Sequence, residues 1–232
     1  MVVGNTIKEK PLLIVELIGP AGAGKTTLSH ALCYRSEKIQ IGAEIELRKL
    51  RYSTIFVWNA LMLLPVILHQ WRRSRWFTWE EIKYLVYLMG WPRVLMRQAA
   101  HNDTVILLDH GPVFKLATLN AFGPEEFKDQ SLDIWWNDMF KQWASTLDIV
   151  VWLDAPDPIL EKRINSRLQR HMVKGKSEAE VLQFLERYRT SYEQVLAKLK
   201  THGGPALLRF DTSQTTLEQV ADQVLQSIDL AS

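Results

Sequence analysis

Cysteine is almost absent from this sequence, whose 232 residues include only Cys33. A lone cysteine cannot form an internal disulfide, so the chain is not a disulfide-stabilised secreted domain, and a cytoplasmic location is expected. A dominant charge is lacking as well, because 28 Lys and Arg oppose 26 Asp and Glu, for a formal net charge of +2. Such a balance argues against nucleic acid as the main partner.

Long apolar runs are also missing. The most apolar segment, residues 60–68, contains Pro65 and is followed by His69 and Gln70. It is therefore far shorter than the roughly 20 apolar residues that span a bilayer. The first apolar run, residues 12–18, lacks the small-residue cleavage site that follows the apolar part of a secretory signal. We expect neither a membrane span nor a secretory signal.

Four short apolar runs, rich in branched side chains, predict buried strands of a parallel sheet. These runs cover residues 11–18, 104–108, 147–153 and 206–210. Helical spacing or helix-start signals are found at residues 25–37, 53–76, 78–100, 158–170, 177–199 and 216–228. Strands that alternate with helices predict an α/β fold, with helices on both faces of one parallel sheet. Because no repeat or linker is found, residues 1–232 are expected to form a single domain.

Several helix boundaries are marked by local signals. The segments Thr78–Glu81 and Ser177–Glu180 have the pattern of a capping box, and Thr216–Gln219 opens the last helix in the same way. Inside the helix that begins near residue 78, Gly90 and Pro92 predict a break or a kink.

A glycine-rich turn follows the first predicted strand directly and opens the first predicted helix. Its sequence, Gly19-Pro-Ala-Gly22-Ala-Gly24-Lys25-Thr26, has the spacing of a P-loop. Glycines let successive backbone N–H groups face phosphate oxygens, and the following helix adds its positive N-terminal end. Lys25 would then reach the outer phosphates, and the Thr26 hydroxyl would join the Mg²⁺ shell. The residues predicted to bind the nucleotide here are Gly19, Ala21, Gly22, Ala23, Gly24, Lys25, Thr26 and Thr27.

A metal at such a loop also needs a carboxylate, which normally projects from the end of a neighbouring strand. Asp109 ends the run Val-Ile-Leu-Leu and precedes a tight turn, His110-Gly111-Pro112, at the edge where ligands of α/β sheets bind. Asp154 ends another apolar run, but the residues that follow it suit turn chemistry alone. We favour Asp109, either as a Mg²⁺ ligand or as the base that takes the acceptor's proton.

Three arginines recur at spacings of four and three residues, so Arg163, Arg167 and Arg170 share one face of a predicted helix. Positive charge continues into the loop that follows them. Beside a P-loop, we interpret residues 158–180 as a lid whose arginines neutralise the transferring phosphate and exclude water. The alternative is an ordinary solvated basic helix.

In these motifs the chain resembles the P-loop nucleoside and nucleotide kinases, thymidylate-kinase-like and deoxynucleoside-kinase-like, over most of its length except residues 40–100. The resemblance is carried by the P-loop, Asp109-His110-Gly111, Val151–Arg167, Phe184–Tyr188 with Tyr192, and Asp211-Thr212-Ser213. It implies a P-loop three-layer sandwich with a helical lid, ATP as donor, Mg²⁺ as cofactor, and Arg163 and Arg167 in the lid. It also implies that Asp211 and Thr212 lie near the adenine.

The sequence defines the acceptor side less sharply. Where the family commonly has an arginine after the strand-end acid, this chain has His110, and a neutral imidazole is a poorer phosphate ligand than a guanidinium. Residues 40–100 are interpreted as a helical acceptor-side region, where Glu44 or Glu46 contacts the acceptor's hydroxyl. We assign Glu44, His110 and Arg170 to acceptor binding. The tryptophans of this region either stack on the acceptor or pack helices against the core.

Together these features predict an ATP- and Mg²⁺-dependent kinase that transfers the γ-phosphate to a hydroxyl of a small nucleoside-like or specialised-metabolite acceptor. The alternatives are a thymidylate-like nucleoside monophosphate kinase and a P-loop protein that binds or hydrolyses nucleotide without a phosphate acceptor. A guanine-specific switch is disfavoured, because the Asn-Lys-x-Asp motif is absent. The sequence is compatible with a homodimer.

Overall fold

The structure, a computed structural model, describes residues 12–42, 57–59, 61, 63, 77–99, 104–124, 133–166 and 172–231. Most of the helix predicted over residues 53–76 lies outside these ranges. Three of the predicted site residues also lie outside the described residues, namely Glu44, Arg167 and Arg170.

Five parallel strands form one sheet in the order β2-β3-β1-β4-β5. They are β1 (Leu12–Ile18), β2 (Ile39–Ile41), β3 (Thr104–Asp109), β4 (Ile149–Asp154) and β5 (Ala206–Asp211). The four strands predicted from apolar runs are confirmed. Strand β2 was not predicted, because its three residues are too few to show a periodicity.

The described helices are α1 (Lys25–Arg35), α3 (Trp79–Ala99), α4 (Pro112–Phe122), α5 (Asp133–Thr146), α6 (Asp157–Ser166), α7 (Glu178–Thr201) and α8 (Leu217–Ala231). The predicted caps are confirmed. Ser177 and Glu180 form a complete capping box at α7, and reciprocal hydrogen bonds join Thr78 to Glu81 and Thr216 to Gln219. Gly90 and Pro92 do not break α3, since one helix runs through both residues, whereas the alternative prediction of a kink stays a prediction.

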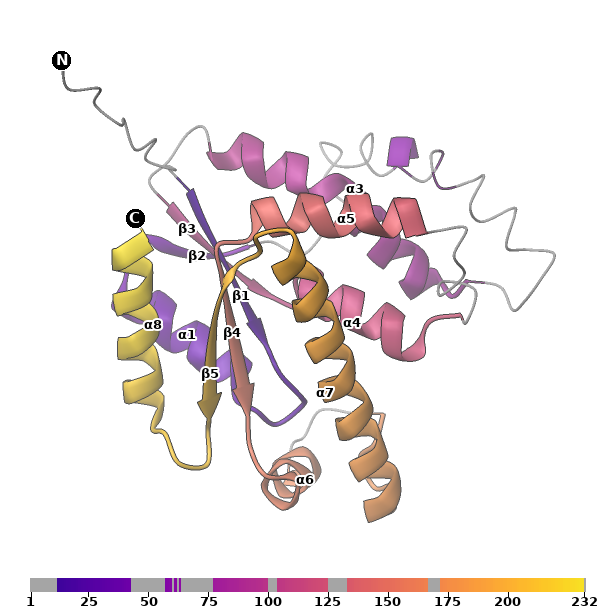
Figure 1. Ribbon diagram of the computed structural model, residues 1–232. Coiled ribbons are helices and arrows are strands. Elements are labelled where there is room, and N and C mark those ends of the chain that lie inside the picture. Colours follow the sequence, from indigo (N-terminus) through magenta and orange to yellow (C-terminus); the bar gives the residue numbers. More distant parts are fainter. Residues whose placement is uncertain are drawn as a thin grey trace.

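Two hydrophobic cores lie on opposite faces of the sheet, and the side chains of β1 alternate between them. Ile14 and Ile18 join the core formed with α3, α4, α5 and most of α7. Leu13, Val15 and Leu17 join the core formed with α1, α6 and α8. Figure 1 shows the resulting three layers, with α1 and α8 on one side of the strands and α3, α4, α5 and α7 on the other. The α/β prediction with helices on both faces is confirmed.

The tryptophans of the acceptor-side region do not share one environment. Trp91 is buried and stacks on Tyr87 with ring centroids 5.3 Å apart. Trp58 and Trp79, in contrast, are each 57% exposed. Core packing therefore explains Trp91 but not the other two.

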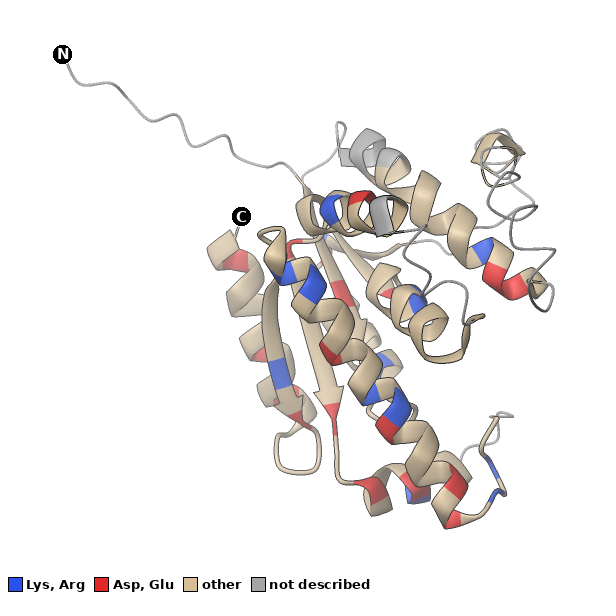
Figure 2. Cartoon of the chain, turned by 45° about the vertical axis from the view of Figure 1, so that its right-hand side comes forward, with Lys and Arg blue, Asp and Glu red and all other residues tan. Residues whose placement is uncertain are grey.

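Basic and acidic residues are interspersed along α7 and also occur on the edge strand β5 (Figure 2). Arg209 of β5 pairs with Glu193 of α7 at 2.7 Å, and its guanidinium lies over the Trp152 ring. Across the described ranges, every helix is too short or too polar to cross a bilayer.

Candidate active site

The carboxyl ends of the parallel strands meet at one edge of the sheet, and the predicted P-loop begins there, at the end of β1. Because β1 lies between β3 and β4, the acids that end those strands, Asp109 and Asp154, both lie beside the loop. Ligands of open α/β sheets bind outside this edge. The topology thus brings together the loop and the two candidate acids.

The loop turns sharply from β1 into α1. Gly19 has a φ of +138°, and a Cβ there would overlap the carbonyl oxygen of Leu153 in β4, so only glycine fits. The Nζ of Lys25 donates to the carbonyl oxygens of Gly19 at 2.7 Å and Pro20 at 3.1 Å, which keeps the ammonium within the loop. No side chain caps α1 at Gly24. The start of α1 therefore has the arrangement of phosphate sites at helix N-termini, where backbone amides and the helix dipole favour an anion.

Asp109 lies next to the hydroxyl residue of the loop. Thr26 Oγ1 is 3.4 Å from Asp109 Oδ2. The other carboxylate oxygen, Asp109 Oδ1, is buried and accepts no hydrogen bond from the described residues, although His110 Nδ1 lies 3.9 Å away. A buried carboxylate oxygen that lacks a donor beside a hydroxyl suits Mg²⁺, which prefers oxygen ligands. Thr26 and Asp109 therefore fit the metal that the sequence predicts.

The alternative acid, Asp154, already has its hydrogen bonds satisfied. Its Oδ2 accepts from Arg189 Nε at 2.8 Å, and its Oδ1 accepts from the Ala155 amide at 2.8 Å. Arg189 also pairs with Asp157 at 2.6 Å. Hydrogen bonding to Asp154 raises the pKa of Arg189 above its ordinary value, so the guanidinium keeps its charge beside both carboxylates. Asp154 stabilises the turn into α6 and not the candidate metal site.

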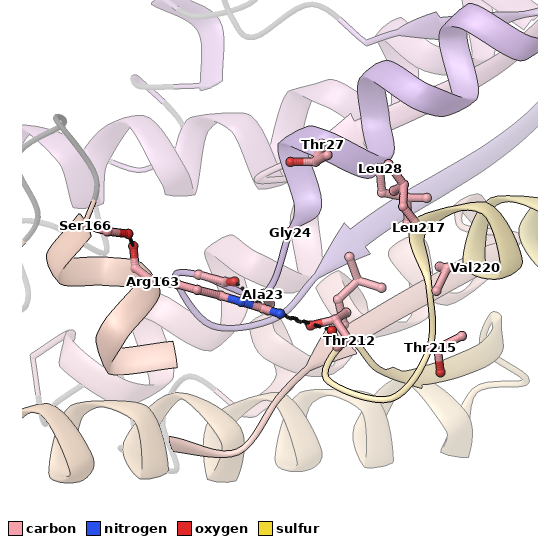
Figure 3. Close-up of a pocket in the computed structure, with 12 residues that line it drawn as sticks. Ala23, Gly24, Thr27, Leu28, Arg163, Ser166, Thr212, Thr215, Leu217 and Val220 are labelled. Carbon is pink, nitrogen blue, oxygen red and sulfur yellow. Dashed lines mark hydrogen bonds between the residues drawn. The ribbon is translucent and has the colours of Figure 1, made fainter. Parts of the chain in front are cut away.

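A cavity of about 380 Å³ lies between the P-loop, α6 and the start of α8. Arg163 of α6 crosses one side of it (Figure 3). Its Nη1 donates to the Gly22 carbonyl at 3.2 Å and to Thr212 Oγ1 at 2.9 Å, and its Nη2 donates to the Thr212 carbonyl at 3.1 Å. Leu217 and Val220 add apolar surface. A guanidinium face opposite aliphatic side chains suits the flat base of a nucleotide.

The other predicted nucleotide residues divide between this cavity and its support. Ala23 and Thr27 line the cavity, whereas Asp211 does not belong to its lining. The Asp211 carboxylate instead accepts hydrogen bonds from Ser213 Oγ at 2.6 Å and from the Ser213 amide at 2.8 Å, which lower the pKa of Asp211. Asp211 thereby shapes the turn that presents Thr212.

His110 does not line the cavity and lies at the start of the turn into α4. It is the one residue other than glycine with a positive φ, +59°, among the described residues. Its imidazole lies 4.4 Å from the Phe114 ring, measured between centroids, and the side chain is 46% exposed. Phe114 in turn stacks on Tyr188 of α7 at 6.2 Å. An aromatic wall therefore borders the site beyond Asp109.

Sequence reasoning missed one acidic residue of the site, Glu16 in the middle of β1. Its side chain is fully buried, and its two oxygens accept hydrogen bonds from the Val113 and Phe114 amides, each at 2.9 Å. Burial raises the pKa of Glu16 to about 7, against the opposing effect of the two amides and of Lys115, and nearby Asp109 adds to the rise. The available signal was a lone acid within an apolar strand, which requires a buried partner.

No protein-family model matches the chain, and no curated protein sequence gives a significant match. Solved structures do match. Thymidylate kinase from Candida albicans has a TM-score of 0.57 at 16% identity, covering 94% of this chain and 91% of that chain. Deoxyadenosine kinase from M. mycoides has a TM-score of 0.54 at 15% identity, covering 94% of this chain and 100% of that chain.

The YorR protein from Bacillus subtilis, solved in complex with phosphorylated GDP, has a TM-score of 0.50 at 16% identity. That match covers 94% of this chain and 96% of the YorR chain. At identities this low, the shared property is the fold. These comparisons and the strand order show that the chain has the α/β fold of the P-loop nucleoside and nucleotide kinases.

Proposed function

We propose that this chain is an ATP- and Mg²⁺-dependent kinase that transfers the γ-phosphate to a hydroxyl of a nucleoside-like or specialised-metabolite acceptor. The observation that carries this proposal is the arrangement at the ends of β1 and β3. There Thr26 Oγ1 lies 3.4 Å from the carboxylate of Asp109, and Lys25 Nζ donates to the Gly19 carbonyl of the loop. Structural neighbours that are nucleoside and nucleotide kinases support the same reaction class.

Each residue of this junction has a separate task. The loop amides and Lys25 hold the outer phosphates, while Thr26 and Asp109 hold the metal. When bound, Mg²⁺ supplies positive charge to the phosphate oxygens. The acceptor's hydroxyl oxygen forms a bond to the γ-phosphorus and loses its proton, either to Asp109 or to an oxygen of the transferred phosphate. The bond from that phosphorus to the bridging oxygen breaks, and ADP leaves with that oxygen. The protein contributes mainly position and electrostatic stabilisation.

The donor's base fits the cavity beside Arg163. The guanidinium is fixed by the Gly22 carbonyl and by Thr212, so its flat face is held in one orientation. A fixed planar cation can stack on a nucleotide base. We assign the Thr212 loop and Arg163 to the donor side of the reaction.

A hydroxyl acceptor is favoured over a phosphate acceptor by the residue after Asp109. His110 packs its ring against Phe114, 4.4 Å away between centroids, where an arginine would present a bidentate cation. The aromatic wall of Phe114 and Tyr188 suits a flat acceptor. A nucleoside or a comparable ring-containing alcohol meets both conditions.

The proposal is tested by incubating the purified chain with ATP, Mg²⁺ and a pool of nucleosides, nucleoside monophosphates and hydroxylated metabolites, followed by mass spectrometry for one added phosphate. We expect a product from a hydroxylated compound, and none from the Lys25→Ala variant, whose circular dichroism should match the wild type. Lys200→Ala, which removes an exposed lysine of α7, is the matched control. A product formed only from nucleoside monophosphates would contradict the hydroxyl acceptor, and turnover by Lys25→Ala would contradict the site.

The two roles open to Asp109 can be separated with Asp109→Asn. If Asp109 binds the metal, the variant needs more Mg²⁺ for half its maximal rate. If it accepts the hydroxyl proton, the variant keeps the normal Mg²⁺ requirement, and kcat at saturating Mg²⁺ falls. The 3.4 Å approach of Thr26 to Asp109 makes the first result the expected one.

A further inference from the structure

Glu16 is an acid in the interior of the molecule. It lies in the central strand between Ile14 and Ile18 on the face packed against α4, and none of its surface is exposed. A carboxylate in such a place is unfavourable unless hydrogen bonds replace the lost water. Both of its oxygens have such partners, and both partners belong to α4.

The start of α4 has no cap of its own. Its N-cap residue, Gly111, has no side chain to accept a hydrogen bond, and Pro112 at the first position has no N–H. The first two amides that the helix offers are therefore those of Val113 and Phe114, and these are the ones that Glu16 accepts, each at 2.9 Å. A negative side chain at a helix N-terminus is also favoured by the helix dipole. Glu16 thus caps α4 from the strand that carries the P-loop.

The same carboxyl group fixes the turn between β3 and α4. A Cβ placed on Gly111 would come within 2.7 Å of Glu16 Cδ, so the backbone passes directly against the carboxyl group. Just before it, His110 has the left-handed φ of +59°, which few non-glycine residues adopt unless their surroundings hold them there. Lys115 Nζ donates to the His110 carbonyl. The turn is held by Glu16 at one end and by Lys115 at the other.

We infer that Glu16 is a positioning residue, which holds the Asp109–His110 turn in register with the P-loop through its cap on α4. Asp109 is separated from Val113, the first capped residue, by only His110, Gly111 and Pro112, and β1 connects Glu16 directly to Gly19. A shift of α4 would therefore move the candidate metal ligand relative to Thr26, which lies 3.4 Å from it. The consequence for catalysis rests on the proposed function, whereas the cap itself does not.

The test compares Glu16→Gln with Ile14→Val, a conservative change on the same face of β1. A glutamine has the same shape, but its NH₂ group faces one of the two amides and loses that hydrogen bond. We expect Glu16→Gln to lower kcat about tenfold, the effect of losing one hydrogen bond to a charged group of about 1.4 kcal/mol, with the KM for ATP changed less than about twofold. Ile14→Val should lower stability by a similar amount without changing kcat.

Gly111→Ala disturbs the same contact between the turn and Glu16, and it replaces Glu16→Gln in the test if that variant does not fold. It should lower kcat in the same way, because its methyl group must displace either the carboxyl group or the turn. If Glu16→Gln, or Gly111→Ala in its place, has the same kcat as Ile14→Val, the carboxylate only stabilises the fold. That result would overturn the inference.

Amide hydrogen exchange separates this inference from the proposed function. If the wild-type chain phosphorylates no acceptor, the proposed function fails, but exchange at Val113 and Phe114 still tests the cap. Faster exchange there in Glu16→Gln than in Ile14→Val supports the cap. Equal exchange rates in the two variants would overturn it.

Discussion

Replacing Arg163 with alanine tests the donor side of the site most directly. The guanidinium makes three hydrogen bonds, one to the Gly22 carbonyl and two to Thr212, and so joins the P-loop to the loop before α8. A hydrogen bond from a charged donor contributes about 1.5–3 kcal/mol when buried and less where water competes, as it does beside this cavity. We therefore expect Arg163→Ala to weaken nucleotide binding by about 2 kcal/mol, or about 30-fold.

The assay is calorimetric titration with a non-hydrolysable ATP analogue and Mg²⁺, combined with steady-state kinetics. Arg163→Lys is the matched variant, because it keeps the charge but lacks the planar fork of donors that joins Gly22 to Thr212, and it should bind with intermediate affinity. Binding by Arg163→Ala within about twofold of the wild type would refute the reasoning. A fall in kcat of about 100-fold with unchanged binding would instead place Arg163 on the transferring phosphate, as a lid arginine.

Two further predictions concern stability. Trp143 is fully buried and its Nε1 donates to the Leu88 carbonyl at 3.0 Å, so Trp143→Phe should lower the free energy of unfolding by about 2–4 kcal/mol in urea titrations, and a loss below about 1 kcal/mol would contradict this. The pKa of Glu16 is raised from 4.5 to about 7 by burial, with Asp109, Lys115 and Tyr192 as its charged or titratable neighbours. Between these pH values the folded chain binds more protons than the unfolded chain, so the contribution of Glu16 falls as pH rises from about 4.5 to about 7, by at most about 3 kcal/mol. Measured as wild type minus Glu16→Gln, the stability difference should shrink over this range, and a difference independent of pH would show that Glu16 does not titrate there.

The strands of this fold could be predicted because a parallel sheet buries both faces of each strand. Such strands read as continuous apolar runs, and the four longest were found in this way. Helix α4 was missed for a related reason. It packs between α3 and α7, so its sequence PVFKLATLNAF is apolar on several sides and shows no helical alternation. Pro92 does not end α3, so of the break or kink that local preference predicts, only the break is excluded.

The loop residues of the candidate site could be proposed from the sequence because the pattern that marks them is local. Gly19, Lys25 and Thr26 act through one strand–turn–helix connection. The preference for Asp109 over Asp154 depends on partners distant in sequence, and the hydrogen bond from Arg189 to Asp154 supports that preference. The contacts of Arg163 with Thr212 and of Glu16 with α4 join residues 49 and nearly 100 positions apart, which no local pattern records.

The alternation of side chains along β1 has a consequence for how this protein can change over time. Leu13, Val15 and Leu17 belong to the compartment shared with α1 and α8, while Ile14 and Ile18 belong to the one shared with α3, α4 and α5. A sheet of backbone separates the two compartments, so a repacking on the aromatic side leaves the opposite side undisturbed. If the proposed function holds, substitutions around the Phe114 and Tyr188 rings can change the choice of acceptor while the P-loop side of the sheet keeps its packing.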